Sequence, residues 1–135
     1  MTRDDVQAWL DRYSEAWRTY DPDAIGDLFA KDATYRYHPY DEPVRGRADI
    51  VLDWLSEKDD AGTYEGRYEV FAADEDRAVA IGTSRYDGPD GAIKAVYHNI
   101  FTLHFDAEGR CTEFVEYFME LPESQRAELA LASSR

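Results

Sequence analysis

The first twenty residues carry apolar side chains at the period of an α-helix. Thr2 and Asp5 fit the capping box that starts a helix. Asp21 followed by Pro22 is typical of a second helix start, because Asp caps free N–H groups and Pro suits the first helical position. The second helix is predicted to bury Ile25, Leu28 and Phe29. The first is predicted to bury a stripe made of Val6, Trp9, Leu10, Tyr13, Trp17 and Tyr20.

Beyond these helices the pattern becomes that of strands. Residues 33–38 are rich in β-branched and aromatic types and end at a proline. The stretch 39–46 holds two prolines and a glycine and is predicted to be a loop, and a third helix is predicted over about 47–57. Turn sequences then separate four strand segments, near 63–73, 77–87, 92–105 and 110–120.

Helices followed by closely spaced strands indicate an α+β fold. Connections this short force neighbouring strands to be antiparallel. We expect three N-terminal helices packed on one face of a strongly curved, mostly antiparallel sheet that forms a cone with a central pocket. The length of 135 residues is that of one domain, predicted over 1–135, with 121–135 as a marginal helix or frayed tail.

Charge and cysteine content narrow the range of partners. The chain has 29 Asp and Glu against 15 Lys and Arg, a net charge of -14. This field repels phosphate groups, so neither nucleic acid nor an anionic membrane surface is an expected partner. The lone Cys111 excludes an intramolecular disulfide. The N-terminal residues lack the apolar segment of a signal peptide, and no apolar run is long enough to span a membrane, so we predict a cytoplasmic location.

Two stretches of the chain resemble the SnoaL-like, nuclear transport factor 2-like superfamily, which has a ketosteroid isomerase-like (cystatin-like) fold. The resemblance implies a cofactor-free pocket for a small molecule, between helices and sheet, and a homodimer formed through the outer sheet face. The first stretch includes Tyr13, 21–25, 28–35, 42–43 and 46–50, and the second includes 97–101, 105–106, 109–110 and 116–117.

The resemblance also allows a test for ketosteroid isomerase activity. The isomerase tyrosine that stabilises an enolate falls on Tyr13. The position of the general-base aspartate holds Tyr37, and that of the second oxyanion-hole acid holds Phe101. Because two of the three catalytic groups are missing, a steroid isomerase is not expected.

Glu116 and His38 are the candidates for proton transfer, with Tyr13 as a partner. The resemblance turns Phe114 and Glu116 inward, where desolvation would raise the pKa of the carboxyl toward neutrality. The opposite phase of the strand would expose Glu116 to solvent instead. His38, at the end of the first strand, could act as a base near neutral pH or could hold the loop that follows.

Other polar residues are candidates for substrate binding. Asn99 is the polar exception among the inward positions of 92–105, and His98 and His104 fall on the opposite face. Asp53 could pair with His38 or Arg85 across the pocket, or could lie on the helix surface. An aromatic lining, whose members could each fill the core instead, is predicted from Tyr13, Trp17, Tyr35, Tyr37, Trp54, Tyr97 and Phe114.

These features leave two functional hypotheses. No Gly-rich phosphate loop, HExxH or GxSxG motif occurs, and the histidines lack metal-ligand spacing, so neither a cofactor nor a metal is predicted. The first hypothesis is an acid–base enzyme of the isomerase, dehydratase, cyclase or epoxide hydrolase type, acting on a small, largely apolar oxygenated compound. Tyr13, Tyr37 and Asn99 would orient its oxygen. The second is a non-catalytic ligand-binding or structural dimer.

Overall fold

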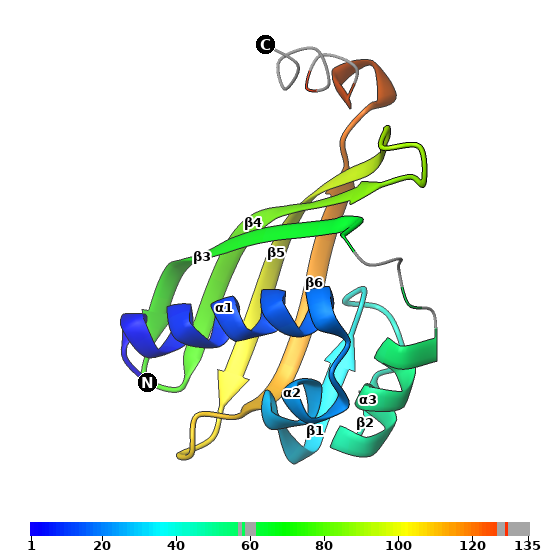
Figure 1. The fold of residues 1–135 in the computed structure, drawn as a ribbon. Coiled ribbons are helices and arrows are strands. Elements are labelled where there is room, and N and C mark those ends of the chain that lie inside the picture. The colour runs from blue at the N-terminus through cyan, green and yellow to red at the C-terminus, as the bar shows by residue number, and fades with distance from the viewer. Residues whose placement is uncertain (57, 59–61, 127–128, 130–135) are drawn as a thin grey trace.

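The computed structural model describes residues 1–56, 58, 62–126 and 129, and Figure 1 shows its helices on one side of a curled sheet. This arrangement confirms the predicted α+β class. The elements in chain order are α1 (Arg3–Thr19), α2 (Pro22–Asp27), β1 (Phe29–Arg36), β2 (Val44–Arg45), α3 (Arg47–Ser56), β3 (Tyr64–Asp74), β4 (Arg77–Asp87), β5 (Ile93–Phe105) and β6 (Cys111–Glu120).

Both predicted helix starts are confirmed by their caps. The Thr2 hydroxyl accepts a hydrogen bond from the Asp5 N–H at 3.1 Å, and the Asp5 carboxylate accepts one from the Thr2 N–H at 2.9 Å. At α2 the Asp21 carboxylate accepts a hydrogen bond from the Asp23 N–H at 3.0 Å. α1 ends at Thr19, and the left-handed backbone of the cap residue Tyr20 turns the chain toward α2. These local signals work because capping depends on residues only two or three positions apart.

The sheet is mixed and unclosed, in the order β2-β1-β6-β5-β4-β3. β1 runs parallel to β6, whereas the other neighbours are antiparallel. The predicted bounds of the first strand are wrong, because β1 begins at Phe29 and ends before His38. The predicted loop over 39–46 contains β2, a two-residue strand paired with Thr34 and Tyr35. A pair this short has no periodicity that a sequence could show.

The side of the sheet that faces the helices forms the core. In β5 the inward positions Phe101, Leu103 and Phe105 are buried as the alternation predicted, while Ile100 is exposed on the outer face. In β6, Phe114 is buried and Tyr117 is exposed, so the inward phase is the one that includes Glu116. In β5 and β6, the side chains that face the helices are therefore the ones of the Phe101 and Phe114 phase.

The C-terminal segment leaves the sheet beside β5. The Leu121 N–H donates to the Val96 carbonyl at 2.8 Å, and residues 123–126 are helical. The predicted tail lies outside the described residues at 127–128 and 130–135, as does residue 57 at the end of the third predicted helix. Among the described residues, no helix has the length and apolar character to cross a membrane.

Candidate functional site

A cavity of about 320 Å³ opens between α1 and the inner face of the sheet. It lies where the C-terminal half of α1 meets the start of β3 and the ends of β4 and β6. Seven of the ten tyrosines of the chain contribute to its wall. The lining residues are Tyr13, Trp17, Tyr35, Tyr37, Tyr64, Tyr68, Ser84, Tyr86, Lys94, Ala95, Tyr97, Asn99, Glu116 and Phe118.

Glu116 is the carboxylate of this cavity. β6 turns it inward opposite Phe101 of β5, where aromatic rings replace the water that would solvate its charge. Burial therefore raises the pKa of Glu116 from its ordinary value near 4.5 to about 7, and nearby His38 opposes part of this rise. No side chain among the described residues gives the Glu116 carboxylate a hydrogen bond within the cavity. A carboxyl group that is half protonated near neutral pH can both accept and donate a proton.

A chain of hydroxyl groups crosses the cavity wall from β3 to β5. The Tyr64 and Tyr68 hydroxyls lie 2.8 Å apart, and the Tyr68 hydroxyl lies 2.6 Å from the Ser84 Oγ. The Asn99 side-chain amide donates to the same Ser84 oxygen. The three hydroxyls have three protons but share only two links, so one proton remains for a further acceptor. The wall can thus offer a hydrogen bond to an oxygen atom of a bound molecule.

Two further hydrogen-bond contacts involve tyrosines of the cavity wall. The Tyr13 and Tyr35 hydroxyls lie 3.3 Å apart, and burial raises the pKa of both phenols well above the ordinary value, so they stay protonated. The Tyr37 hydroxyl donates to the Asp53 carboxylate at 2.6 Å. That bond ties the segment just after β1 to α3 and holds the Tyr37 ring at the cavity edge.

Gly66 provides the space for the tyrosines of β3. Tyr64, Gly66 and Tyr68 share the inward face of this strand, and the Tyr64 ring folds back over the glycine to reach Tyr68. A Cβ atom at Gly66 would come within 2.0 Å of the Tyr64 hydroxyl oxygen. The hydroxyl chain therefore requires a residue without a side chain here.

The structure brings most of the predicted site residues together. Seven of them line the cavity: Tyr13, Trp17, Tyr35, Tyr37, Tyr97, Asn99 and Glu116. Trp54 and Phe114 lie behind the wall as fully buried core residues. The Trp54 ring stacks on Trp17 at 4.1 Å, and the Phe114 ring stacks on Tyr35 at 4.4 Å, so both support the lining.

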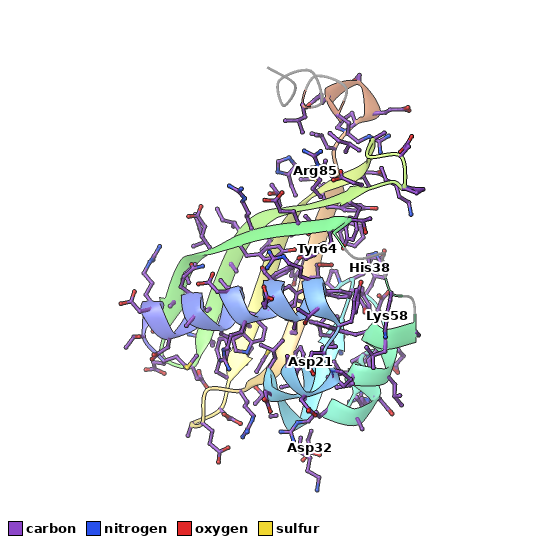
Figure 2. The ribbon with its side chains drawn as sticks, viewed as in Figure 1. Asp21, Asp32, His38, Lys58, Tyr64 and Arg85 are labelled. Atoms are coloured by element: carbon purple, nitrogen blue, oxygen red, sulfur yellow. The ribbon has the colours of Figure 1, made fainter. Side chains whose placement is uncertain are left out.

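His38 and Asp53 lie differently from the pairing that the sequence suggested. His38 stands at the rim, with its Nδ1 2.8 Å from an Asp41 carboxylate oxygen and its ring 4.9 Å from that of Phe118. Asp53 pairs with Tyr37 rather than with His38 or Arg85. Figure 2 shows Arg85 and His38 apart from each other, and the Arg85 guanidinium contacts Asp87 at 2.9 Å. His38 thus holds the loop, which was one of its two expected roles.

Sequence reasoning missed half of the cavity wall. Tyr64, Tyr68, Ser84, Tyr86 and Lys94 come from β3, β4 and the start of β5, and none of these five residues was predicted to line the pocket. The alternation in β3 of tyrosine and glycine with charged residues was the available signal, because it gives one aromatic face. Within the described part of the chain, no three His, Cys, Asp or Glu side chains are placed to hold a metal ion.

Comparisons with known proteins agree with this architecture. The family described as SnoaL-like domain matches residues 10–114. A solved LEH-like epoxide hydrolase from Mycobacterium tuberculosis is similar in fold, with a TM-score of 0.66, 15% sequence identity, and coverage of 87% of this chain and 84% of that one. No curated protein matches the sequence. In all, 358 solved chains match, so the fold is widely shared and does not identify an activity.

Proposed function

The chain belongs to the SnoaL-like family, and we propose that its cavity binds a small, largely apolar oxygenated compound on which Glu116 acts as general base and acid without a cofactor. The observation that carries this proposal is the position of the Glu116 carboxyl, inside an aromatic cavity, with a pKa raised to about 7. Such a group reaches both protonation states at neutral pH.

The proposed chemistry is a proton transfer between carbon or oxygen atoms. The Glu116 carboxylate takes a proton from a carbon beside a carbonyl group, and the electron pair of the broken C–H bond moves to the carbonyl oxygen. A hydroxyl of the Tyr64, Tyr68 and Ser84 chain donates a hydrogen bond to that oxygen. The protonated Glu116 then returns the proton at another position. Isomerisation, dehydration and cyclisation by carbon–carbon bond formation use such a step. In epoxide opening the Glu116 carboxylate would instead take a proton from a water molecule, whose oxygen bonds to an epoxide carbon as the C–O bond breaks, and the protonated Glu116 would return the proton to the former epoxide oxygen. These are the reaction classes of the proposal.

A non-catalytic binding protein is the second candidate. The observation that favours it is that His38 contacts Asp41 at the rim, so the described residues that line the cavity include no histidine to relay the Glu116 proton. In this case the tyrosine wall would select a ligand by shape, and Glu116 would contribute only a contact.

We further propose a homodimer formed through the outer face of the sheet. Three apolar side chains are exposed on the outer face of β5 and β6, those of Ile100, Tyr117 and Met119. Ile100 and Tyr117 lie directly opposite each other on the two paired strands. Apolar side chains gathered in one patch are typical of a protein interface. A single domain over 1–135, a cytoplasmic location and the lack of a nucleic acid partner stay predictions from composition and charge.

Deuterium exchange into a simple ketone tests the acid–base role. 2-Tetralone, an aromatic ketone with acidic C–H groups, is incubated with the protein in D2O, and deuterium uptake is followed by NMR. We expect wild-type protein to exchange it at least about 100-fold faster than Glu116→Gln, because general-base catalysis contributes on that order. The matched control is Glu113→Gln on the same strand, outside the cavity lining. Equal rates for wild type and Glu116→Gln, with 2-tetralone shown to bind, would favour the non-catalytic candidate.

A further inference from the structure

An arc of aromatic rings surrounds the space above Glu116. Tyr64 lies 6.3 Å from Trp17 and 5.4 Å from Tyr86, measured between ring centroids. Tyr97 continues the arc at 6.0 Å from Tyr86 and 5.3 Å from Phe118. The five residues come from α1, β3, β4, β5 and β6, so the rings approach one volume from different directions. Neighbouring rings are tilted or perpendicular, and the cavity is therefore bordered by both ring faces and ring edges.

Glu116 gives this arc a negative charge whenever its carboxyl group is ionised. Glu116 is the one carboxylate among the described residues that line the cavity. Lys94 is the one lysine or arginine among them, and it is exposed, so water and salt screen its charge. His38 faces the same region from the rim, but Asp41 already pairs with it. The net charge of -14 adds a long-range field that attracts cations and repels anions.

We propose that the compound bound in this cavity carries a positively charged nitrogen, which lies against the Glu116 carboxylate and within the arc of Trp17, Tyr64, Tyr86, Tyr97 and Phe118. The inference rests on the proposed function, because it takes the same cavity and the same carboxylate and adds the charge of the occupant. Aromatic ring faces attract organic cations, and this attraction strengthens when water is excluded. An anion would meet both the Glu116 charge and the negative ring faces.

A cationic occupant also explains how Glu116 becomes a base when it is needed. In the free protein, burial keeps a large fraction of Glu116 protonated near pH 7. A bound cation favours the ionised carboxylate, so the proton leaves to solvent as the occupant enters. The same positive charge acidifies the neighbouring C–H groups of the bound molecule. The Glu116 carboxylate would then both pair with the bound cation and remove a proton from it.

Three probes of similar size and different charge test the inference. They are benzyltrimethylammonium as the cation, 3-phenylpropanol as the neutral molecule and 3-phenylpropanoate as the anion. Binding to the full chain at pH 7.5 is measured by tryptophan fluorescence, since Trp17 lines the cavity, and by calorimetry. We expect the cation to bind about tenfold more tightly than the alcohol, and the anion more weakly than both. Equal or tighter binding of the alcohol or the anion would overturn the inference.

Variants connect that preference to the residues. Glu116→Gln is expected to abolish most of the preference for the cation while leaving alcohol binding within about twofold, because Gln keeps the shape and removes the charge. Tyr97→Leu is expected to weaken binding of the cation more than binding of the alcohol. Lys94→Gln, which removes the exposed positive charge of the cavity lining, is the control with the opposite sign and should strengthen cation binding slightly. A cation preference that survives Glu116→Gln and Tyr97→Leu unchanged would place the cation elsewhere and overturn the inference.

The outcomes separate this inference from the proposed function. Exchange of 2-tetralone that depends on Glu116, without any preference for the cationic probe, overturns the inference and leaves the acid–base role. A cation preference that depends on Glu116, without exchange, supports the inference and favours the non-catalytic candidate. A benzyltrimethylammonium ion that does not bind at millimolar concentration, while 3-phenylpropanol does, also overturns the inference.

Discussion

The side of the sheet that faces the helices has two ends built from the same strands. At the core end, Trp9, Phe29, Leu103 and Phe105 pack with little space between them, and the Trp9 indole donates its N–H to the Leu28 carbonyl at 2.9 Å. At the cavity end, the same strands carry tyrosines, Ser84, Asn99 and Glu116 around an open volume of about 320 Å³. One end is filled and the other is hollow, although both have the same alternation of inward and outward positions.

The difference lies in the polar tips of the side chains. A buried phenol hydroxyl needs a hydrogen-bond partner, so the tyrosines meet tip to tip or tip to side chain, as in the Tyr64, Tyr68 and Ser84 chain. These hydrogen bonds hold the tyrosine rings in the wall, and the cavity of about 320 Å³ lies beside them. Phe101 and Phe114 stand at the boundary and are fully buried. The comparison shows that one sheet face can combine a stabilising core with a binding cavity.

The largest expected effect comes from removing a ring at each end. Phe105 at the core end is 3% exposed, and Phe118 at the cavity end is 38% exposed. Phe105→Ala is expected to lower the free energy of unfolding by about 3–5 kcal/mol, because it leaves a void in a packed core. Phe118→Ala should lower it by less than about 1 kcal/mol, and urea denaturation measures both. Similar losses at both ends would mean that the cavity end is as tightly packed as the core.

The next effect concerns the cost of keeping Glu116 inside the cavity. Its pKa is about 7 in the folded protein against an ordinary value near 4.5, so the folded state holds a proton that the unfolded state releases between these values. Stability therefore falls as the pH rises from about 4.5 to about 7, and the penalty is complete above pH 7. Glu116→Gln removes it and should stabilise the protein by up to about 3 kcal/mol at pH 8.

At pH 4 the same substitution should change the stability little, since both states then hold the proton. The control is Glu69→Gln, which replaces an exposed acid on the outer face of β3 and should change stability by less than about 0.5 kcal/mol at either pH. Thermal unfolding at pH 4 and pH 8 provides the comparison. A stabilisation that is the same at both pH values would contradict the buried carboxylate.

A smaller effect on stability is expected from the hydrogen bond between Tyr37 and Asp53 at the cavity edge. Tyr37→Phe removes the hydroxyl that donates to Asp53 and leaves the ring, so we expect a loss of about 1–2 kcal/mol in the free energy of unfolding. Tyr117→Phe on the exposed outer face should change it by less than about 0.5 kcal/mol. Denaturation curves of the two variants under one set of conditions check this. If Tyr37→Phe leaves the free energy of unfolding unchanged, the hydrogen bond between Tyr37 and Asp53 makes no net contribution to stability.

Local sequence signals predicted the helices and the four long strands with small errors at their ends. The caps at Thr2 and Asp21 depend on side chains that reach two or three residues along the chain, which a sequence displays directly. β2 and the start of β1 escaped prediction because their hydrogen bonds join residues about ten positions apart or on distant strands, as between Phe29 and Cys111. The parallel pairing of β1 with β6 has no local signal.

The candidate site was predicted in part for the same reason. Tyr13, Tyr35, Asn99 and Glu116 were found from alternation together with the family resemblance, and they line the cavity. The tyrosines of β3 and β4 were missed because a strand pattern shows which residues share a face but not which end of that face stays open. The pairing of Asp53 with Tyr37 depends on how α3 packs against β1.

The sequence by itself determined the types of the three helices and the long strands, the starts of the first two helices, the acidic composition and the two faces of each long strand, because these depend on neighbouring residues and composition. Only the tertiary structure decided which face of β6 turns inward, and with it the burial that raises the pKa of Glu116. It also decided that Trp54 and Phe114 support the wall from behind, whereas Tyr64 and Tyr97 border the cavity. Packing between distant segments sets these outcomes, and the free energy of a buried charge or ring depends on everything that surrounds it.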